Sequence, residues 1–401
     1  MDRYRKRTEA QLRIIKSQSG SDYTYDFSLW CGRERPVFGQ RSVEAQQYKN
    51  RKAAIEAIKD HIADFRRKLV SSLQAANRDY QKAIGDWLQD IPRMIKKEFL
   101  PPKDSQFAQK MIRLEQRAKS GEQVVLTITT NEYLIPWWLT HSYTSDELNQ
   151  IWSALFVIGF MPAHITLDPH KTKPISKPRI ALISRPSSDL RNARRITDKL
   201  IMKNLAHQVE IHNGEKNEPE IELGRFGLLR EEIEKTLSEN QVLFYYGHFE
   251  LNEKFPEQSY LEALDEFAAG RMEHDVEPEK ITLKSVEKLI KGKVLFLDAC
   301  RSIGLPFLAD KPFPQHNEIL PDFYLINKAI CIGTIYPIFD DAAVDYMTSF
   351  IQFLLDGYTL GEAMKKAREE LDRVGYSPFN WASYILVGDP NLKLITKQGD
   401  K

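Results

Sequence analysis

The sequence predicts an α/β fold: a three-layer α/β/α sandwich around a mostly parallel sheet, preceded by a helical N-terminal segment. Three observations lead to this prediction. Short apolar runs recur after residue 179, segments with helical spacing separate them, and the runs have no polar face. Strands of parallel sheets are buried on both faces and show such continuous runs. With 401 residues, 42% of them hydrophobic, the chain can build a large core.

The front of the chain lacks this alternation. Residues 1–42 form an N-terminal extension in which the aromatic, Gly- and Pro-containing stretch 22–39 suggests a hairpin. Residues 43–120 form a helical region. Its apolar residues recur every three or four positions, at Ile55, Ile58, Ile62, Phe65 and Leu69. We expect Pro92 to interrupt this region and Pro101-Pro102 to end it.

From residue 121 to 401 the sequence predicts one α/β domain. Residues 123–129 predict a strand, 133–139 an apolar segment kinked by Pro136, 146–160 a helix and 163–178 a loop. The later strands are predicted over 179–184, 208–213, 241–249, 293–300, 328–337 and 383–389. The helices between them are predicted over 188–204, 225–238, 282–291, 341–356 and 359–373.

Charge is distributed unevenly although the formal net charge is only +1. Residues 1–120 contain 26 Lys and Arg against 15 Asp and Glu, and the remainder contains 31 against 41. The basic front attracts the acidic remainder of the chain, meets an acidic partner, or is a solvated helix face. It contains no recognisable nucleic-acid-binding module, so we do not expect nucleic-acid binding.

Cysteine usage and hydropathy predict a cytoplasmic protein. The three cysteines, Cys31, Cys300 and Cys331, provide no disulfide framework. The basic N-terminus is not followed by the apolar core of a signal peptide. The longest apolar run, 152–163, is shorter than the roughly 20 residues of a membrane-spanning helix. We therefore expect no membrane segment.

Two reactive residues follow apolar runs that predict strands. His248 comes after Leu-Phe-Tyr-Tyr-Gly, and Cys300 comes after Leu-Phe-Leu-Asp-Ala, 52 residues later. Ligands bind at the carboxyl ends of parallel strands, and a thiol beside an imidazole is a usual nucleophile. If the strands are neighbours, the residues form a His–Cys dyad. The alternative is a buried cysteine beside an unrelated histidine.

Five stretches, in order along residues 70–397, resemble the CHAT family of caspase-like (clan CD) cysteine peptidases. They are Glu-Tyr-Leu-Ile-Pro-Trp-Trp-Leu-Thr from 132, Tyr-Tyr-Gly-His-Phe from 245, Phe-Leu-Asp-Ala-Cys-Arg-Ser from 296, the stretch 328–371, and Asn-Trp-Ala-Ser-Tyr-Ile-Leu-Val-Gly-Asp-Pro from 380. The resemblance implies a caspase-like domain. Two departures are Phe249, where family members commonly have glycine, and Trp138, where they have glutamate.

The resemblance also implies roles for the site residues. Cys300 is the expected nucleophile, and His248 orients the attack and protonates the leaving amine. The N–H of Cys300 and one near His248, in the stretch Gly247–Phe249, form the expected oxyanion hole. Phe249 in place of glycine would weaken that contribution.

Two acidic positions are candidates for substrate selection. Asp298 lies two residues before Cys300, and its counterpart in several caspase-like branches selects a basic P1 residue. The alternative is that Asp298 only hydrogen-bonds nearby groups. Asp340, with Asp341, follows the predicted strand 328–337 and could add negative charge near the same edge. The long segments 250–281 and 302–323 suggest a gated cleft.

The sequence therefore predicts an intracellular cysteine endopeptidase that cleaves a protein substrate. The family context adds activation by a protein partner, through the helical front, in a bacterial defence or regulated-death pathway. The spacing of the histidines suggests no metal site, and no phosphate-binding loop is present, so no cofactor is expected. The alternatives are a catalytically inactive caspase-like interaction module and, more remotely, a small-ligand sensor.

Overall fold

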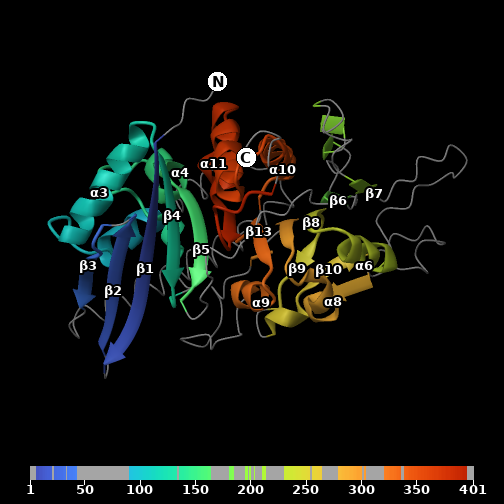
Figure 1. The fold of residues 1–401 in the computed structure, drawn as a ribbon, viewed down its shortest axis with the longest axis horizontal. Helices are drawn as coiled ribbons and strands as arrows, with labels where there is room; N and C mark the ends of the chain where they lie inside the picture. The colour runs from blue at the N-terminus through green and yellow to red at the C-terminus, as the bar shows by residue number, and fades with distance from the viewer. Residues whose placement is uncertain are drawn as a thin grey trace, which may run out of the picture. The chain divides into compact units, whose positions relative to one another are not determined.

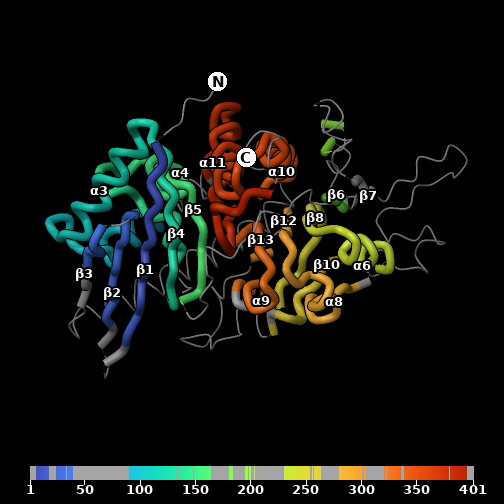
Figure 2. Tube along the Cα trace, viewed as in Figure 1, coloured from blue at the N-terminus to red at the C-terminus, as the bar shows by residue number. Residues whose placement is uncertain are grey.

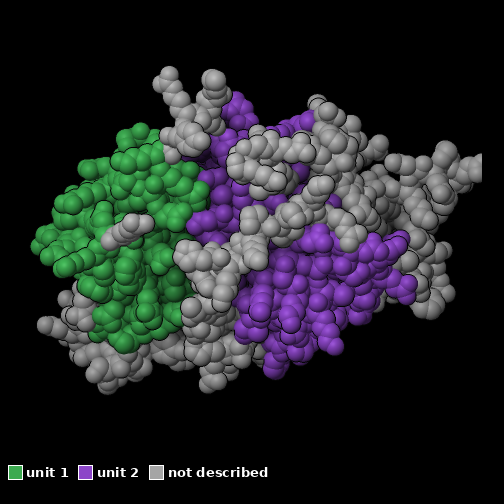
Figure 3. Space-filling view, viewed as in Figure 1, with its two compact units in different colours: residues 1–166, 306–310 green, residues 167–305, 311–401 purple. Residues whose placement is uncertain are grey.

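The computed structural model describes residues 6–19, 22–32, 34–42, 90–132, 135–163, 180–184, 195–196, 198–199, 203, 210–213, 230–252, 255–263, 279–299, 302–303, 320–335 and 338–394. The expected helical stripe at 55–69 and Cys300 itself lie outside these residues. The chain divides into two compact units, residues 1–166 with 306–310 and residues 167–305 with 311–401 (Figure 3). The domain boundary expected at 120 and 121 stays a prediction.

The first unit is built on strands in the order β3-β2-β1-β4-β5. These are β1 (Arg7–Ser19), β2 (Asp22–Cys31), β3 (Val37–Ser42), β4 (Gln123–Thr130) and β5 (Val157–Pro162). β1 pairs with β2 and β2 with β3 in antiparallel fashion, whereas β4 runs parallel to both β1 and β5. In β1 the buried residues Ala10, Leu12 and Ile14 alternate with exposed ones, as in a strand with one covered face.

Helix α3 (Gln106–Lys119) packs against this sheet, where Phe107 contacts Phe27 with ring centroids 5.2 Å apart. Ser105 caps the helix by accepting the N–H of Ala108. Residues 90–98 are also helical, with Pro92 in the first described turn, where a proline is tolerated. Since residues 43–89 lie outside the described residues, the expected interruption at Pro92 stays a prediction.

The expected helix over 146–160 is wrong. The structure has the short helices η1 (Trp137–Leu139), η2 (Leu148–Gln150) and α4 (Trp152–Leu155), followed by β5. β5 pairs with β4 from Val157 opposite Val125 to Pro162 opposite Thr130. Periodicity alone cannot distinguish a buried strand from a helix in a short apolar run, and here the available partner strand decides.

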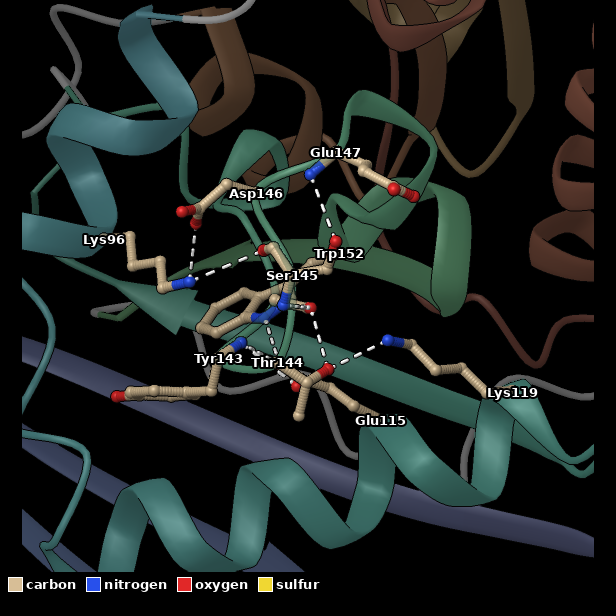
Figure 4. Close-up of polar contacts among 10 residues, drawn as sticks. Lys96, Glu115, Lys119, Tyr143, Thr144, Ser145, Asp146, Glu147 and Trp152 are labelled. Atoms are coloured by element: carbon tan, nitrogen blue, oxygen red, sulfur yellow. Dashed lines mark hydrogen bonds and ion pairs between the residues drawn. The ribbon is translucent and has the colours of Figure 1, made fainter.

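A buried carboxylate holds the loop that precedes α4. Glu115 on α3 is fully buried and accepts hydrogen bonds from the Tyr143 N–H at 3.0 and 3.1 Å and from the Trp152 Nε1–H at 3.2 Å. Figure 4 shows its carboxylate pointing from the helix toward this loop. Burial raises the pKa of Glu115, and the bonds from Tyr143 and Trp152 oppose that rise.

The second unit contains strands in the order β14-β13-β12-β8-β6-β7. These are β6 (Ile180–Ser184), β7 (Glu210–Asn213), β8 (Val242–Tyr246), β12 (Val294–Asp298), β13 (Ile330–Thr334) and β14 (Tyr384–Val387). All neighbours run parallel except β14, which is antiparallel to β13. The predicted α/β fold with a mostly parallel sheet is confirmed.

Helices cover both faces of this sheet. Figures 1 and 2 show α10 (Asp340–Leu355) and α11 (Leu360–Arg373) on one side, and α6 (Arg230–Glu239), α8 (Leu283–Ile290) and α9 (Leu320–Ile326) on the other. On the α10 side, Phe296 of β12 contacts Phe350 with ring centroids 4.8 Å apart. The short helix α12 (Pro378–Ala382) precedes β14. This arrangement matches the predicted three layers.

Parts of the two long segments that were expected to be loops are regular. β9 (Phe249–Glu250), η4 (Pro256–Gln258), β10 (Tyr260–Ala263) and β11 (Glu279–Thr282) lie in or beside the first, and the three strands form a small antiparallel sheet in the order β11-β10-β9. Helix α9 begins within the second. Their proposed gating role stays a prediction. Among the described residues, none of the helices has the length and apolar character required to span a bilayer.

Candidate active site

The two strands that precede His248 and Cys300 are direct neighbours. β8 and β12 run parallel, all five residues of each are buried, and their last matched pair is Tyr246 opposite Asp298. His248 and Cys300 each follow their member of this pair by two positions. The condition that the sequence set for a dyad, adjacency of the strands, is therefore met, whereas the contact between the two side chains stays a prediction.

The backbone at His248 is held by a buried tyrosine. The Tyr245 hydroxyl donates to the carbonyl oxygen of His248 at 2.9 Å and lies 3.3 Å from that of Glu262. Gly247 is required by this arrangement, because a Cβ there would lie 2.6 Å from the Tyr245 hydroxyl oxygen. The His248 side chain is half-buried. The imidazole thus stands at the strand end on a fixed backbone.

Phe249 has a structural role in the small antiparallel sheet. It is 6% exposed, and in β9 it pairs with Leu261 of β10. The aromatic side chain that replaces the family's glycine therefore lies mostly out of solvent. Its effect on an oxyanion hole stays a prediction, as does the contribution of Gly247.

Ser302, two residues after Cys300, is held by hydrogen bonds on the α9 side of the sheet. We call residues 299–302 the nucleophile segment. The Ser302 hydroxyl donates to the Leu297 carbonyl oxygen at 2.7 Å and accepts the Thr334 N–H at 3.1 Å. The Ser302 carbonyl oxygen in turn accepts the Tyr324 hydroxyl of α9 at 3.1 Å. The side-chain hydroxyl and the backbone carbonyl of Ser302 are therefore both hydrogen-bonded to neighbouring elements.

Gly333 makes the position of Ser302 possible. A Cβ at Gly333 would lie 2.2 Å from the Ser302 Oγ, so a side chain there would have to displace the serine hydroxyl. The glycine of Ile-Gly-Thr near the end of β13 thus provides the space that the Ser302 hydroxyl occupies. This explains a small residue in the middle of an otherwise apolar strand.

The other end of the nucleophile segment is held on the α10 side. The Thr334 Oγ1 donates to the Ala299 carbonyl oxygen at 2.8 Å, and the Tyr384 hydroxyl donates to Asp298 Oδ1 at 2.6 Å. Residues before and after Cys300 are therefore fixed by β13, β14 and α9. Such support from surrounding elements is what keeps a reacting group in one geometry.

Asp298 itself is deeply buried. It is 4% exposed, and burial raises the pKa of its carboxyl to about 8, although the bond from Tyr384 acts in the opposite direction. Its Oδ2 has no hydrogen-bond partner among the described residues. This environment favours the second interpretation of Asp298, in which it bonds to nearby groups. Its predicted selection of a basic P1 residue stays untested.

Asp340 and Asp341 occupy the first turn of α10, where acidic residues complement the helix N-terminus. Asp341 forms an ion pair with Arg195, and one turn later Asp345 pairs with Lys199 and accepts the Tyr376 hydroxyl at 3.0 Å. These contacts connect α10 to the helical residues around 195–199. Whether Asp340 contacts a substrate stays a prediction.

The other two cysteines are buried within strands. Cys331 of β13 is fully buried, and burial raises its pKa well above the ordinary range of a thiol. Cys31 of β2 is 4% exposed, and burial raises its pKa as well. A protonated, enclosed thiol reacts slowly, so both are inert internal standards for the reactivity of Cys300.

Sequence reasoning missed the residues that support the site. Ser302, Thr334 and Tyr384 carry no chemistry of their own and come from separate parts of the chain. One signal was available, since Tyr384 lies inside the stretch Trp-Ala-Ser-Tyr that resembles the family. Within the described part of the chain, no group of three potential metal-ligating side chains is found.

Comparison with known proteins identifies the family. A model of the CHAT domain matches residues 104–389. No curated protein matches the chain. Among solved structures, a chain of the Saccharomyces cerevisiae separase–securin complex is similar at 12% identity and a TM-score of 0.46, over 96% of this chain and 30% of that one. Since the family model spans well over half of the sequence, the chain belongs to the CHAT-domain family, the caspase-like peptidase family that its motifs predict.

Proposed function

We propose that this chain is a cysteine endopeptidase that hydrolyses peptide bonds of a protein substrate with a His248–Cys300 dyad. The observation that carries the proposal is the register of β8 and β12. Tyr246 stands opposite Asp298, so the histidine and the cysteine follow a matched pair by the same two positions. Membership of the CHAT-domain family supports the same assignment.

The chemistry uses residues at the shared strand edge. The Cys300 thiolate attacks the scissile carbonyl carbon, and the His248 imidazolium donates its proton to the departing amine. Water then attacks the thioester, releases the acid and regenerates the thiol. Backbone N–H groups of Cys300 and of the stretch 247–249 stabilise the oxyanion in both steps. The hydrogen bond from Tyr245 to the His248 backbone supports this geometry.

The proposal extends to the setting of the reaction. The enzyme works in the cytoplasm, and a protein partner activates it through the basic front of the chain, in a defence or regulated-death pathway. The charge of residues 1–120, 26 basic against 15 acidic, favours an acidic partner. Asp340, near the end of β13, adds negative charge to the substrate side.

The first test measures which cysteine is reactive. We expect iodoacetamide to alkylate Cys300 at least tenfold faster than Cys31 and Cys331 at pH 7, because those two thiols are buried and protonated. His248→Ala should remove the advantage. Peptide mapping by mass spectrometry reports each cysteine in the same sample, so the two buried thiols serve as matched controls.

Equal, slow alkylation of all three cysteines would instead support the second candidate, a catalytically inactive interaction module. Turnover is then measured by incubating wild type and Cys300→Ala with lysate of the source cell and comparing new protein N-termini. Termini found only with wild type establish the peptidase. The residue that precedes each cut reports the P1 preference.

A further inference from the structure

The end of β12 carries a carboxyl group that solvent hardly reaches. Asp298 is 4% exposed, and its Oδ1 accepts the Tyr384 hydroxyl at 2.6 Å. A group that recognises a substrate side chain must be accessible from the cleft. Asp298 instead points to the interior on the α10 side, the same side as Phe296 two residues earlier, which packs on Phe350.

The donor of this hydrogen bond is itself fixed. The Tyr384 ring stacks on Tyr346 of α10, with centroids 3.7 Å apart and planes 4° from parallel. Its carbonyl oxygen accepts the Arg368 Nη2–H of α11 at 2.7 Å. Tyr384 is therefore held by two helices at the start of β14.

The topology explains why a residue from β14 reaches β12. β13 lies between the two strands, and Thr334 at its end pairs with Tyr384. The Thr334 hydroxyl itself donates to the Ala299 carbonyl oxygen at 2.8 Å. Asp298 and Ala299, the two residues immediately before Cys300, are thus held by adjacent donors.

We propose that Asp298 is a positioning residue: its carboxyl accepts the Tyr384 hydroxyl and fixes the end of β12, the strand that precedes Cys300. This inference rests on the proposed function, since it concerns the placement of Cys300. A pKa of about 8, raised by burial, supports it, because a carboxyl that is protonated at neutral pH offers no charge to a basic substrate residue.

Three variants separate positioning from recognition. Asp298→Asn keeps a neutral acceptor for the Tyr384 hydroxyl and removes the acidic group. Asp298→Ala removes the acceptor, and Tyr384→Phe removes the donor. Tyr346→Phe is the matched control, because it deletes a buried tyrosine hydroxyl of the same stacked pair, one that lies 3.4 Å from the Met364 carbonyl oxygen and not on Asp298.

The readouts are the Cys300 alkylation rate from pH 5 to 9, and kcat and KM on cleavable peptides with Arg, Lys or neutral P1 residues. We expect Asp298→Asn to retain wild-type values within about threefold. Asp298→Ala and Tyr384→Phe should lower kcat about 10- to 100-fold with little change in KM, as expected for a misplaced nucleophile. Tyr346→Phe should match wild type.

Two results overturn the proposal. If Asp298→Asn loses cleavage after Arg and Lys while neutral substrates survive, Asp298 recognises the substrate. If Cys300 is alkylated rapidly in wild type and equally fast in all variants, the residue positions nothing, although the peptidase proposal stands. Slow alkylation of Cys300 in wild type defeats both proposals together. Circular dichroism of each variant checks folding, and Tyr384→Phe carries the test if Asp298→Ala does not fold.

Discussion

At the scale of single residues, Gly333 and Ser302 share one confined space beside the candidate site. The space that the glycine leaves is filled by the Ser302 hydroxyl, which also bonds to Leu297 and Thr334. We expect Gly333→Ala to lower the free energy of unfolding by about 1–3 kcal/mol, because the new methyl group must displace the serine. Urea unfolding measures this loss.

The double variant supplies the control. Ser302→Ala alone leaves two buried backbone groups without their partner, at a cost of about 1–3 kcal/mol. In Gly333→Ala/Ser302→Ala the hydroxyl that obstructs the methyl group is absent, so the loss in the double variant should be smaller than the sum of the two single losses by about 0.5–3 kcal/mol. Additive losses would show that the two residues do not share this space.

A second prediction at this scale concerns Asp298 and the pH dependence of the free energy of unfolding. The pKa of its carboxyl rises from an ordinary value of 3.8 to about 8 in the fold, so the folded state holds the proton over a wider range. The contribution of proton binding by Asp298 to the free energy of unfolding is complete below about pH 4. It is lost as the pH rises to about 8, by up to about 1.4 kcal/mol per pH unit. Asp298→Asn should therefore gain stability relative to wild type across this window and no further above it.

Urea unfolding of wild type and Asp298→Asn at pH 5, 6.5, 8 and 9 tests the sign. Other titrating groups contribute equally to both proteins and cancel in the difference. A constant difference from pH 5 to 8 would mean that Asp298 is ionised in the fold. Tyr346, which stacks on the donor Tyr384, does not titrate in this range, since burial raises its pKa.

At the scale of elements, the hydrogen bonds of Glu115 join α3 to the loop before α4. Glu115→Ala leaves the Tyr143 N–H and the Trp152 Nε1–H unpaired in the interior, so we expect a loss of about 1–3 kcal/mol and a changed near-ultraviolet tryptophan signal. Lys119→Ala is the matched control. It sits one turn along α3 and bonds to Thr144 of the same loop at an exposed site, so it should cost under about 0.5 kcal/mol.

The elements that the sequence predicted best are those whose burial is continuous. β8, β12 and β13 were found because an apolar run of about six residues that ends at a polar group has few other interpretations. β5 was predicted as part of a helix, because its short apolar run fits either state and only the pairing with β4 makes it a strand. The first 42 residues were left undefined except for a hairpin, although β1 alternates from Thr8 to Ile14.

The residues of the candidate site likewise divide into those that the sequence predicted and those that it did not. His248 and Cys300 could be found because each follows a strand directly and has reactive chemistry. Tyr384, Thr334 and Ser302 could not, because their roles arise from contacts across 32 to 86 positions of sequence. A tyrosine whose task is to bond an aspartate on another strand looks like any other core aromatic in sequence.

At the scale of the whole molecule, all the described supports of the site come from the second unit. β8, β12, β13, β14, α9, α10 and α11 belong to it, and each contributes at least one contact to the strand ends or to Tyr384. The first unit contains the strands β1 to β5 and its own buried polar cluster around Glu115. The residues that support the candidate site and the basic residues 1–120 therefore belong to different units.

The place of Tyr384 in the chain has a consequence for synthesis. Cys300 leaves the ribosome 84 residues before Tyr384, which at about 5–20 residues per second is an interval on the order of ten seconds. During that interval β12 has no β14 to supply its hydrogen bond. If the chain is the peptidase that we propose, the strand end before Cys300 therefore lacks this hydrogen bond until the final strand has been translated.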